Sequence, residues 1–247
     1  MSAAAGGTGG APALSLSFFD PDRKLAGELR TGVTILYEGP SPTALAEGCK
    51  IHREEDGSFA ALMEAGDAEL ALRFGPMGDP AELAGARTWV CRVKGQVAGA
   101  PIDCLGTATE TLEPPNWEEL EAVRSITAVF DPGHALFCVA RRDRGTRAHG
   151  EEAVEAVLIT AGVVHTAEDA RISTVYDGDG RQRQVGLELW FEEEDFPRRA
   201  FGRVSAGTSL ELSGATVHAS VFDWRMEGRE GAGTYDLMVR AGPGEAA

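Results

Sequence analysis

Apolar and polar residues alternate with a period of two along nearly the whole chain, in short segments separated by Gly, Pro and Asp turns. The stretches LELWFE at 187–192 and TVHASVFDW at 216–224 are examples. Successive side chains of a β-strand point to opposite faces, so the pattern predicts half-buried strands. About sixteen such segments lie between residues 14 and 240, which is typical of an all-β sandwich or barrel and not of βαβ units. Residues 27–37 are expected to form one strand, and 199–206 and 208–213 two.

A break at residues 112–123 divides the strands into two groups of similar size. Within it, PPNWEELEAV at 114–123 begins with proline and carries acidic residues in its first turn, which favours a short helix. The sequence therefore predicts two strand-rich halves, 14–111 and 124–240, joined by a linker with one short helix. The Gly- and Ala-rich residues 1–13 are expected to be a disordered leader, and 241–247 a tail.

Two stretches far apart in the chain have the same layout, WVCRVKGQVAGAPIDCLGTATE at 89–110 and VFDWRMEGREGAGTYDLMVR at 221–240. Each has an apolar strand, then Arg-x-x-Gly, then a second strand. Aligning Gly95 with Gly228 places Arg92 on Arg225 and matches an apolar face with an apolar face. This alignment predicts that the second half duplicates the first. The alternative is chance, because Gly-rich hairpins are common in β proteins.

The last hairpin contains the motif W-x-x-x-G-x-x-G-x-G, formed by Trp224, Gly228, Gly231 and Gly233. This motif, with strands that resume after a mid-chain break, resembles the two-part lipocalin-like (calycin) proteins. That group includes hydroxyneurosporene synthase, AttH-like proteins, tocopherol cyclase and lipocalin-like Diels–Alderases. The resemblance covers most of residues 14–240 and implies two lipocalin-like antiparallel β-barrel halves packed on each other. It matches no catalytic motif, so no catalytic residue is carried over from the group.

The net charge of the chain excludes some classes of binding partner. A formal net charge of −16 repels phosphate backbones and anionic membranes, so we expect no nucleic-acid partner. No apolar run approaches the ~18 residues of a membrane span. The four cysteines lack metal-ligand spacing and stand beside apolar strands, which indicates reduced thiols in a cytoplasmic protein. We expect no metal and no cofactor.

The second half offers the best candidate pocket. Its predicted strands place aromatic and ionisable residues on faces able to meet, with the wall formed by Trp190, Phe222, Trp224 and Met226. Glu188 or His218 is the candidate for proton transfer, because an apolar wall keeps a carboxyl protonated or an imidazole uncharged near pH 7. Tyr176, just before the GDG turn, either joins this wall or only ends its strand.

Each of the two proton-transfer candidates has a simpler interpretation. Glu188 lies in solvent if the aliphatic face of strand 183–192 is the core, and it lies in the pocket if the opposite face is. His218 either lines the pocket or lies half-solvated near the start of its strand.

The loop RRDRGTRAHGEE at 141–152 holds the one basic cluster of the sequence. Arg142, Arg144, Arg147 and His149 form a candidate clamp for a carboxylate or phosphate. The alternative is a solvated hairpin loop. His149 with Glu151 or Glu152 is too small a set for a metal site.

Two classes of function fit these features. One is a cofactor-independent cyclase, hydratase or isomerase that acts on an apolar small molecule, such as a terpenoid or polyketide, in a β cavity. The other is a non-catalytic carrier or scaffold of the same shape. A titratable group inside the cavity distinguishes the enzyme from the carrier.

Overall fold

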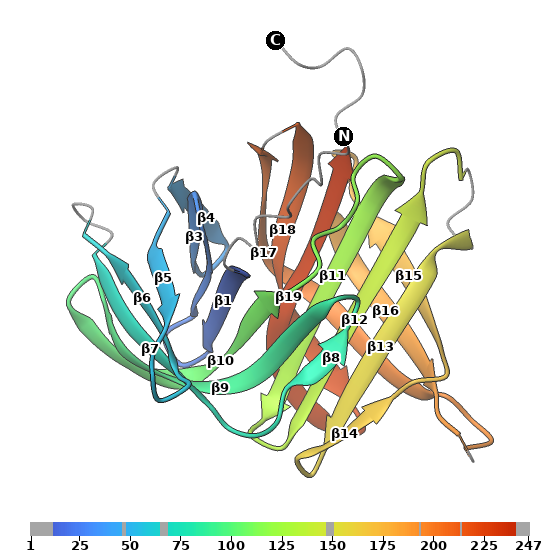
Figure 1. The fold of residues 1–247 in the computed structure, drawn as a ribbon, viewed down its shortest axis with the longest axis horizontal. Helices are drawn as coiled ribbons and strands as arrows, with labels where there is room; N and C mark the ends of the chain where they lie inside the picture. Colours follow the sequence, from blue (N-terminus) through green and yellow to red (C-terminus); the bar gives the residue numbers. More distant parts are fainter. Residues whose placement is uncertain are drawn as a thin grey trace, which may run out of the picture.

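The computed structural model describes residues 12–45, 48–64, 69–146, 151–192, 194–212 and 214–240. In this part of the chain, all paired strands are antiparallel and no element is a helix, so the predicted all-β class is confirmed. Figure 1 shows two curled sheets side by side, the first coloured blue to green and the second green to red. No helix of the described residues is long and apolar enough to cross a membrane.

The first sheet contains ten strands within the described residues: β1 (Ala13–Asp20), β2 (Leu25–Arg30), β3 (Val33–Glu38), β4 (Ser41–Leu45), β5 (Lys50–Arg53), β6 (Phe59–Met63), β7 (Leu70–Pro76), β8 (Ala81–Leu83), β9 (Ala86–Val97) and β10 (Ala100–Thr111). The second contains nine in the same described part: β11 (Leu120–Asp131), β12 (His134–Asp143), β13 (Ala153–Thr160), β14 (Val163–Thr166), β15 (Asp169–Tyr176), β16 (Gln182–Trp190), β17 (Arg198–Leu212), β18 (Ala215–Met226) and β19 (Arg229–Arg240).

The two sheets have the same strand order. The first runs β4-β3-β2-β1-β10-β9-β7-β6-β5, and the second runs β14-β13-β12-β11-β19-β18-β17-β16-β15. Among the described strands, β8, which pairs with β9, lies off this path. Each half therefore repeats one antiparallel plan, and the β9–β10 hairpin corresponds to the β18–β19 hairpin, as the duplication predicts.

The residue alignment within these hairpins is wrong by four positions. Gly95 lies inside β9, opposite Ile102, whereas Gly228 lies in the turn between β18 and β19. The equivalent turns are Ala98–Gly99, with φ of 50° and 72°, and Glu227–Gly228, with φ of 50° and 78°. Two successive residues with positive φ make the tight hairpin turn that matches strand twist. Gly95 is needed for another reason, because a Cβ there would overlap the Ala71 carbonyl oxygen.

The predicted linking helix over 114–123 is wrong. The segment makes a single turn, in which the Asn116 carbonyl accepts from the amides of Glu119 and Leu120 at 3.0 and 3.2 Å. The Asn116 side chain also accepts from the Glu118 amide at 3.1 Å. Leu120 and Ala122 are buried on alternate positions, so the chain continues as β11 from Leu120. Alternating burial of these residues outweighs the helix-start signal.

Three apolar clusters hold the fold together. One fills the first half and includes Phe18, Phe59 and Trp89; a second fills the second half and includes Leu187, Phe222 and Trp224. The third cluster lies between the halves and draws on β3, β12 and β18, with Tyr37, Phe137 and Val221 among its members. The sheets are thus buried on both faces where they meet. All four cysteines are buried and unpaired, as the sequence indicates.

Replacing Gly228 by alanine is expected to destabilise the protein by about 1 kcal/mol. The φ of 78° suits glycine, and a side chain there adopts a left-handed conformation at a cost. Gly178→Ala is the matched control, since a Cβ at that turn glycine has open space and no positive φ constrains it. Urea denaturation of both variants measures the difference. Equal stability of the two variants would contradict the turn assignment.

Candidate functional site

The predicted aromatic wall is part of the core of the second half. Phe222, Trp224 and Met226 are buried on the inner face of β18. The Phe222 ring lies 6.0 Å from that of Trp224 and 5.6 Å from that of Tyr235, measured between centroids. The structure therefore brings three of the four wall residues together, packed against other core side chains.

Glu188 and Trp190 lie on the opposite face of the barrel wall. Val185, Leu187 and Leu189 are the buried apolar residues of β16, so the interpretation in which this aliphatic face is core is the correct one. Glu188 Oε1 accepts from Arg199 Nε at 2.9 Å on the outside, and Trp190 stacks under Arg171 at 4.7 Å. The placement of Glu188 against Phe222 and Trp224 is wrong, because strand parity directs it to the outer surface.

His218 does share the inner face of β18 with Phe222, close to one end of the barrel. Its Nδ1 lies 2.7 Å from Ser209 Oγ. Partial burial lowers the pKa of His218, and the positive charge of Arg181 lowers it further, so the imidazole is neutral near pH 7. Tyr176 also lies on an inner face, at the end of β15, where it interacts with Tyr235. Neither side chain meets Glu188.

The arginines of the predicted clamp point in different directions, as far as they are described. Arg144 Nη1 donates to the Glu118 carbonyl at 3.1 Å, and the buried Arg142 Nε has no hydrogen-bond partner. Arg141 lies on the other face of β12, 3.8 Å from Glu155. Arg147 and His149 lie outside the described residues. Among the residues that are described, no group of three or more His, Cys, Asp or Glu side chains is arranged to hold a metal ion.

A cavity that the sequence does not predict lies between the two halves. It has a volume of about 330 Å³ and is walled by β1, β9 and β10 of one half and by β11, β12 and β19 of the other. Hydroxyl side chains are frequent in its lining, and they include Ser17, Thr88, Thr107, Thr109, Thr127 and Thr234. Arg30 and Asp236 also line it. A small organic molecule is a suitable occupant for a cavity of this size.

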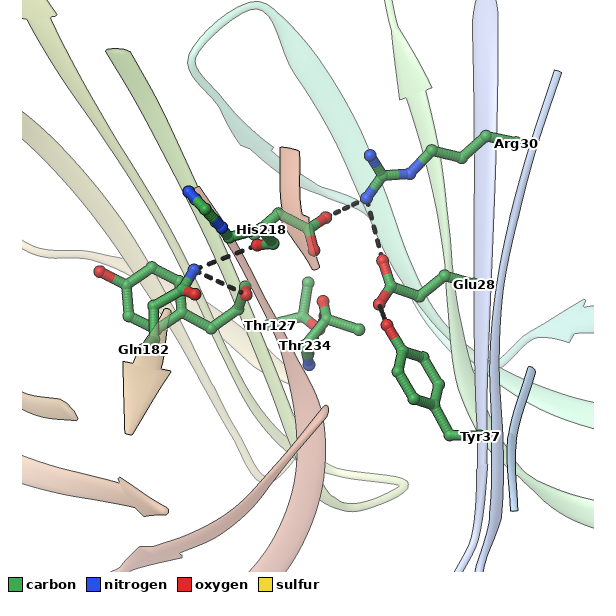
Figure 2. Close-up of polar contacts among 9 residues, drawn as sticks. Glu28, Arg30, Tyr37, Thr127, Gln182, His218 and Thr234 are labelled. Atoms are coloured by element: carbon green, nitrogen blue, oxygen red, sulfur yellow. Dashed lines mark hydrogen bonds and ion pairs between the residues drawn. The ribbon is translucent and has the colours of Figure 1, made fainter. Parts of the chain in front are cut away.

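A buried charged cluster lies at this cavity, with members from both halves (Figure 2). Arg30 Nη2 donates to Glu28 Oε2 at 3.0 Å and also to Asp236 Oδ2. The Tyr37 hydroxyl donates to Glu28 Oε1 at 2.9 Å. Glu28 and Asp236 are only 2% and 4% exposed. One guanidinium thus faces two carboxyl groups away from water.

The cluster has two carboxyl groups and one guanidinium, and it therefore holds a proton at neutral pH. Burial raises the pKa of Glu28 to about 8, and the negative charge of Asp236 and a hydrogen bond with it contribute to the increase. Arg30 and the Tyr37 hydroxyl oppose this increase. Arg30 can neutralise only one of the two carboxyl groups, so the second binds a proton at neutral pH.

Asp236 lies where β19 partly separates from its neighbour β18. His218 pairs with Leu237 and Val221 pairs with Thr234, but Asp236, which lies between these two pairs, has no partner on β18. The Gln182 amide reaches across the barrel into this gap and donates to the His218 and Tyr235 carbonyls, both at 3.2 Å (Figure 2). Gln182 thereby satisfies the carbonyls that the strand ladder leaves open.

A similar side-chain contact replaces strand pairing on the other side of β19. The Thr234 amide donates to Thr127 Oγ1 at 3.1 Å, and the two threonine hydroxyls lie 2.9 Å apart. Thr234 and Asp236 therefore belong to a stretch of β19 in which side chains from β11 and β16 supplement an incomplete strand ladder. This stretch presents Asp236 to the first half.

Sequence reasoning missed this cluster because alternation assigns Glu28 and Asp236 to solvent-facing positions. Those faces are covered by the other half, and alternation within one strand does not reveal a second sheet. One signal is present: VTILYE at 33–38 carries Val33, Ile35 and Tyr37 on one face and Leu36 on the other, which is more apolar than strict alternation and favours a strand buried on both sides.

No protein-family model and no curated protein sequence matches the chain. Two solved structures are similar in fold. A candidate AttH protein from Nitrosomonas europaea has a TM-score of 0.60 and 14% identity over 91% of this chain and 90% of its own. Kievitone hydratase from Nectria haematococca has a TM-score of 0.62 and 10% identity over 94% of this chain and 90% of its own. The chain therefore has the fold of the two-part lipocalin-like proteins, two antiparallel half-barrels packed on each other.

Proposed function

We propose that the chain is an enzyme that binds an apolar small molecule, such as a terpenoid or polyketide, between its halves and transfers a proton to or from it. The observation that carries the proposal is the pair of buried carboxyl groups, Glu28 and Asp236, that share Arg30 beside the cavity. Acid-catalysed hydration, cyclisation and isomerisation of an alkene all begin with such a transfer. The kievitone hydratase of similar fold supports hydration in particular.

In this proposal Asp236 is the catalytic residue that touches the substrate, and Glu28 is the proton store behind it. The proton that the pair binds passes through Asp236 to a carbon of a substrate double bond, whose π electrons form the new C–H bond. The pair is left with two negative charges against one guanidinium. That excess charge stabilises the positive charge formed on the substrate.

The cation is then resolved in one of two ways. Attack by water followed by loss of a proton completes a hydration, whereas loss of a proton from carbon completes an isomerisation or cyclisation. In either case the released proton restores the pair, so the reaction balances without a redox partner.

A solvent-label experiment tests the proposal. A panel of terpenoid and polyketide alkenes is incubated with the protein in D₂O, and mass spectrometry measures deuterium bound to carbon. We expect wild type to label at least one substrate and Glu28→Gln to label it at least about a hundredfold more slowly. Glu188→Gln, which removes a carboxyl from the outer face, is the matched control and is expected to retain the wild-type rate.

Two results would speak against proton transfer at this site. One is equal labelling by wild type and Glu28→Gln. The other is tight binding of a panel member without labelling, which favours the non-catalytic carrier.

A further inference from the structure

We infer that the cavity between the halves selects an uncharged, carbon-rich ligand that bears a hydroxyl group, and that Asp236 Oδ1 accepts the hydrogen bond from that hydroxyl. The inference rests on the proposed function for the location of the site and adds the chemical class of the ligand. Three features of the cavity carry it: an open acceptor, the absence of an uncommitted cation among the described lining residues, and two pairs of wall threonines whose hydroxyls bond to each other.

The open acceptor is Asp236 Oδ1. This buried atom has no N–H or O–H donor within the described part of the chain, while Oδ2 accepts from Arg30. Oδ1 carries two lone pairs, so it can accept the O–H of a ligand. A buried acceptor without a donor is costly, and a hydrogen bond to a charged acceptor is stronger than one between neutral groups. A ligand O–H therefore gains affinity here.

The described cations of the cavity are already committed. Arg30 donates to both Glu28 and Asp236, and Arg141 lies 3.8 Å from Glu155. Glu113 adds a further carboxyl to the lining. A ligand carboxylate or phosphate would thus meet Asp236 without a cation to pair with it, which is unfavourable in a partly desolvated site.

Four threonines of the wall form two hydroxyl pairs. Thr88 and Thr109 hydroxyls lie 3.0 Å apart, and those of Thr127 and Thr234 lie 2.9 Å apart. Such pairing satisfies much of their polarity and leaves their methyl groups to contact a ligand. Apolar side chains, of which Phe137 is one, complete the lining. The body of the ligand is therefore expected to be carbon, with its hydroxyl at the Asp236 end.

Three matched probes test the inference: 1-naphthol, naphthalene and 1-naphthoate share one ring system and differ in a single group. Binding is measured at pH 7 by fluorescence titration against wild type, Asp236→Asn and Glu28→Gln. We expect wild type to bind naphthol at least about tenfold more tightly than naphthalene. Naphthoate is expected to bind more weakly than either.

The two variants have opposite expected results. In Asp236→Asn the amide oxygen still faces Arg30, so the NH₂ group faces the cavity and a donor replaces the acceptor. The preference for naphthol should fall to within about threefold, and naphthoate should gain affinity. Glu28→Gln leaves the Asp236 carboxyl group in place and should keep the preference for naphthol. Both variants leave one carboxylate for one guanidinium, so both are expected to fold.

Three outcomes overturn the inference: no binding of naphthol by wild type, naphthoate binding as tight as that of naphthol, or an unchanged naphthol preference in Asp236→Asn. Failure of the proposed function is distinguishable from these. If the probes follow the expected pattern but no substrate is labelled in D₂O, the result supports the inferred ligand class and contradicts the proposed proton-transfer activity.

Discussion

Replacing Arg30 by methionine is expected to destabilise the protein by about 3–5 kcal/mol. The guanidinium is the shared partner of Glu28 and Asp236, which are 2% and 4% exposed. Removing it leaves two buried carboxyl groups facing each other without a cation, and removal of one partner from a buried ion pair has a cost of this size. Urea denaturation at pH 7 gives the free energy of unfolding.

Two controls separate the charge effect from loss of side-chain packing. Arg225→Met removes an arginine whose pair with Glu230 is about three-quarters exposed on both sides, and it should cost less than about 1 kcal/mol. In a Glu28→Gln/Asp236→Asn background, Arg30→Met should lose most of its effect, because no buried negative charge remains. A cost that persists in full in this background would show that packing of the arginine stem, and not its charge, is what stabilises the interface.

The free energy of unfolding is also expected to fall as pH rises from about 5 to 8. The ionisation of Glu28 by itself should account for a few kcal/mol of this decrease. The pKa of this carboxyl is about 8 in the folded chain and 4.5 ordinarily. Between these values the native state binds more protons than the unfolded state, so unfolding is favoured by rising pH. The contribution is complete below about pH 4.5 and is lost as pH passes through about 8. Each pKa unit corresponds to about 1.4 kcal/mol, which sets an upper limit near 5 kcal/mol.

Comparison with Glu28→Gln isolates this contribution from those of other titrating groups. Urea denaturation of both proteins at pH 5, 7 and 9 should show wild type losing stability relative to the variant at each step. Glu188→Gln, which changes an outer-face carboxyl, should follow the wild-type profile. Parallel profiles for wild type and Glu28→Gln would mean that Glu28 is ionised throughout this range.

The sequence predicted the fold well where burial is one-sided. Strand alternation identified the all-β class, the break at 112–123 separated the two halves, and the matched layouts identified the equivalence of their last hairpins. Local breaks in the period were harder to place. Residues 27–37 form two strands because Thr31–Gly32 make a tight turn, whereas 199–212 form one strand with a bulge between Val204 and Ala206. A bulge shifts the inward positions by one and therefore looks like a strand end in the sequence.

The site was predicted poorly because it depends on how the halves pack. Phe222 and Trp224 were correctly placed inside a barrel, but an inner apolar face is equally a core. Glu28 and Asp236 are 208 positions apart in the chain and meet only across the interface. Alternation within one strand reports which residues share a face and is silent on what covers that face. Only the contact between two sheets makes these two acids neighbours.

The repeated strand plan gives this pair of acids an evolutionary reading. In the first half Ser17 is paired with Thr107 and Glu28, and in the second half the corresponding Ser125 is paired with Asp236 and Val139. The two sets of three paired residues occupy equivalent places in their sheets. Glu28 corresponds to Val139, and Asp236 corresponds to Thr107, so each half has its acid where the other half has an uncharged residue. A symmetric dimer of identical halves would contain every acid twice and would bury twice the negative charge. Fusion of two copies into one chain lets each set change independently, and a single asymmetric proton-binding pair is a product that such a fusion permits.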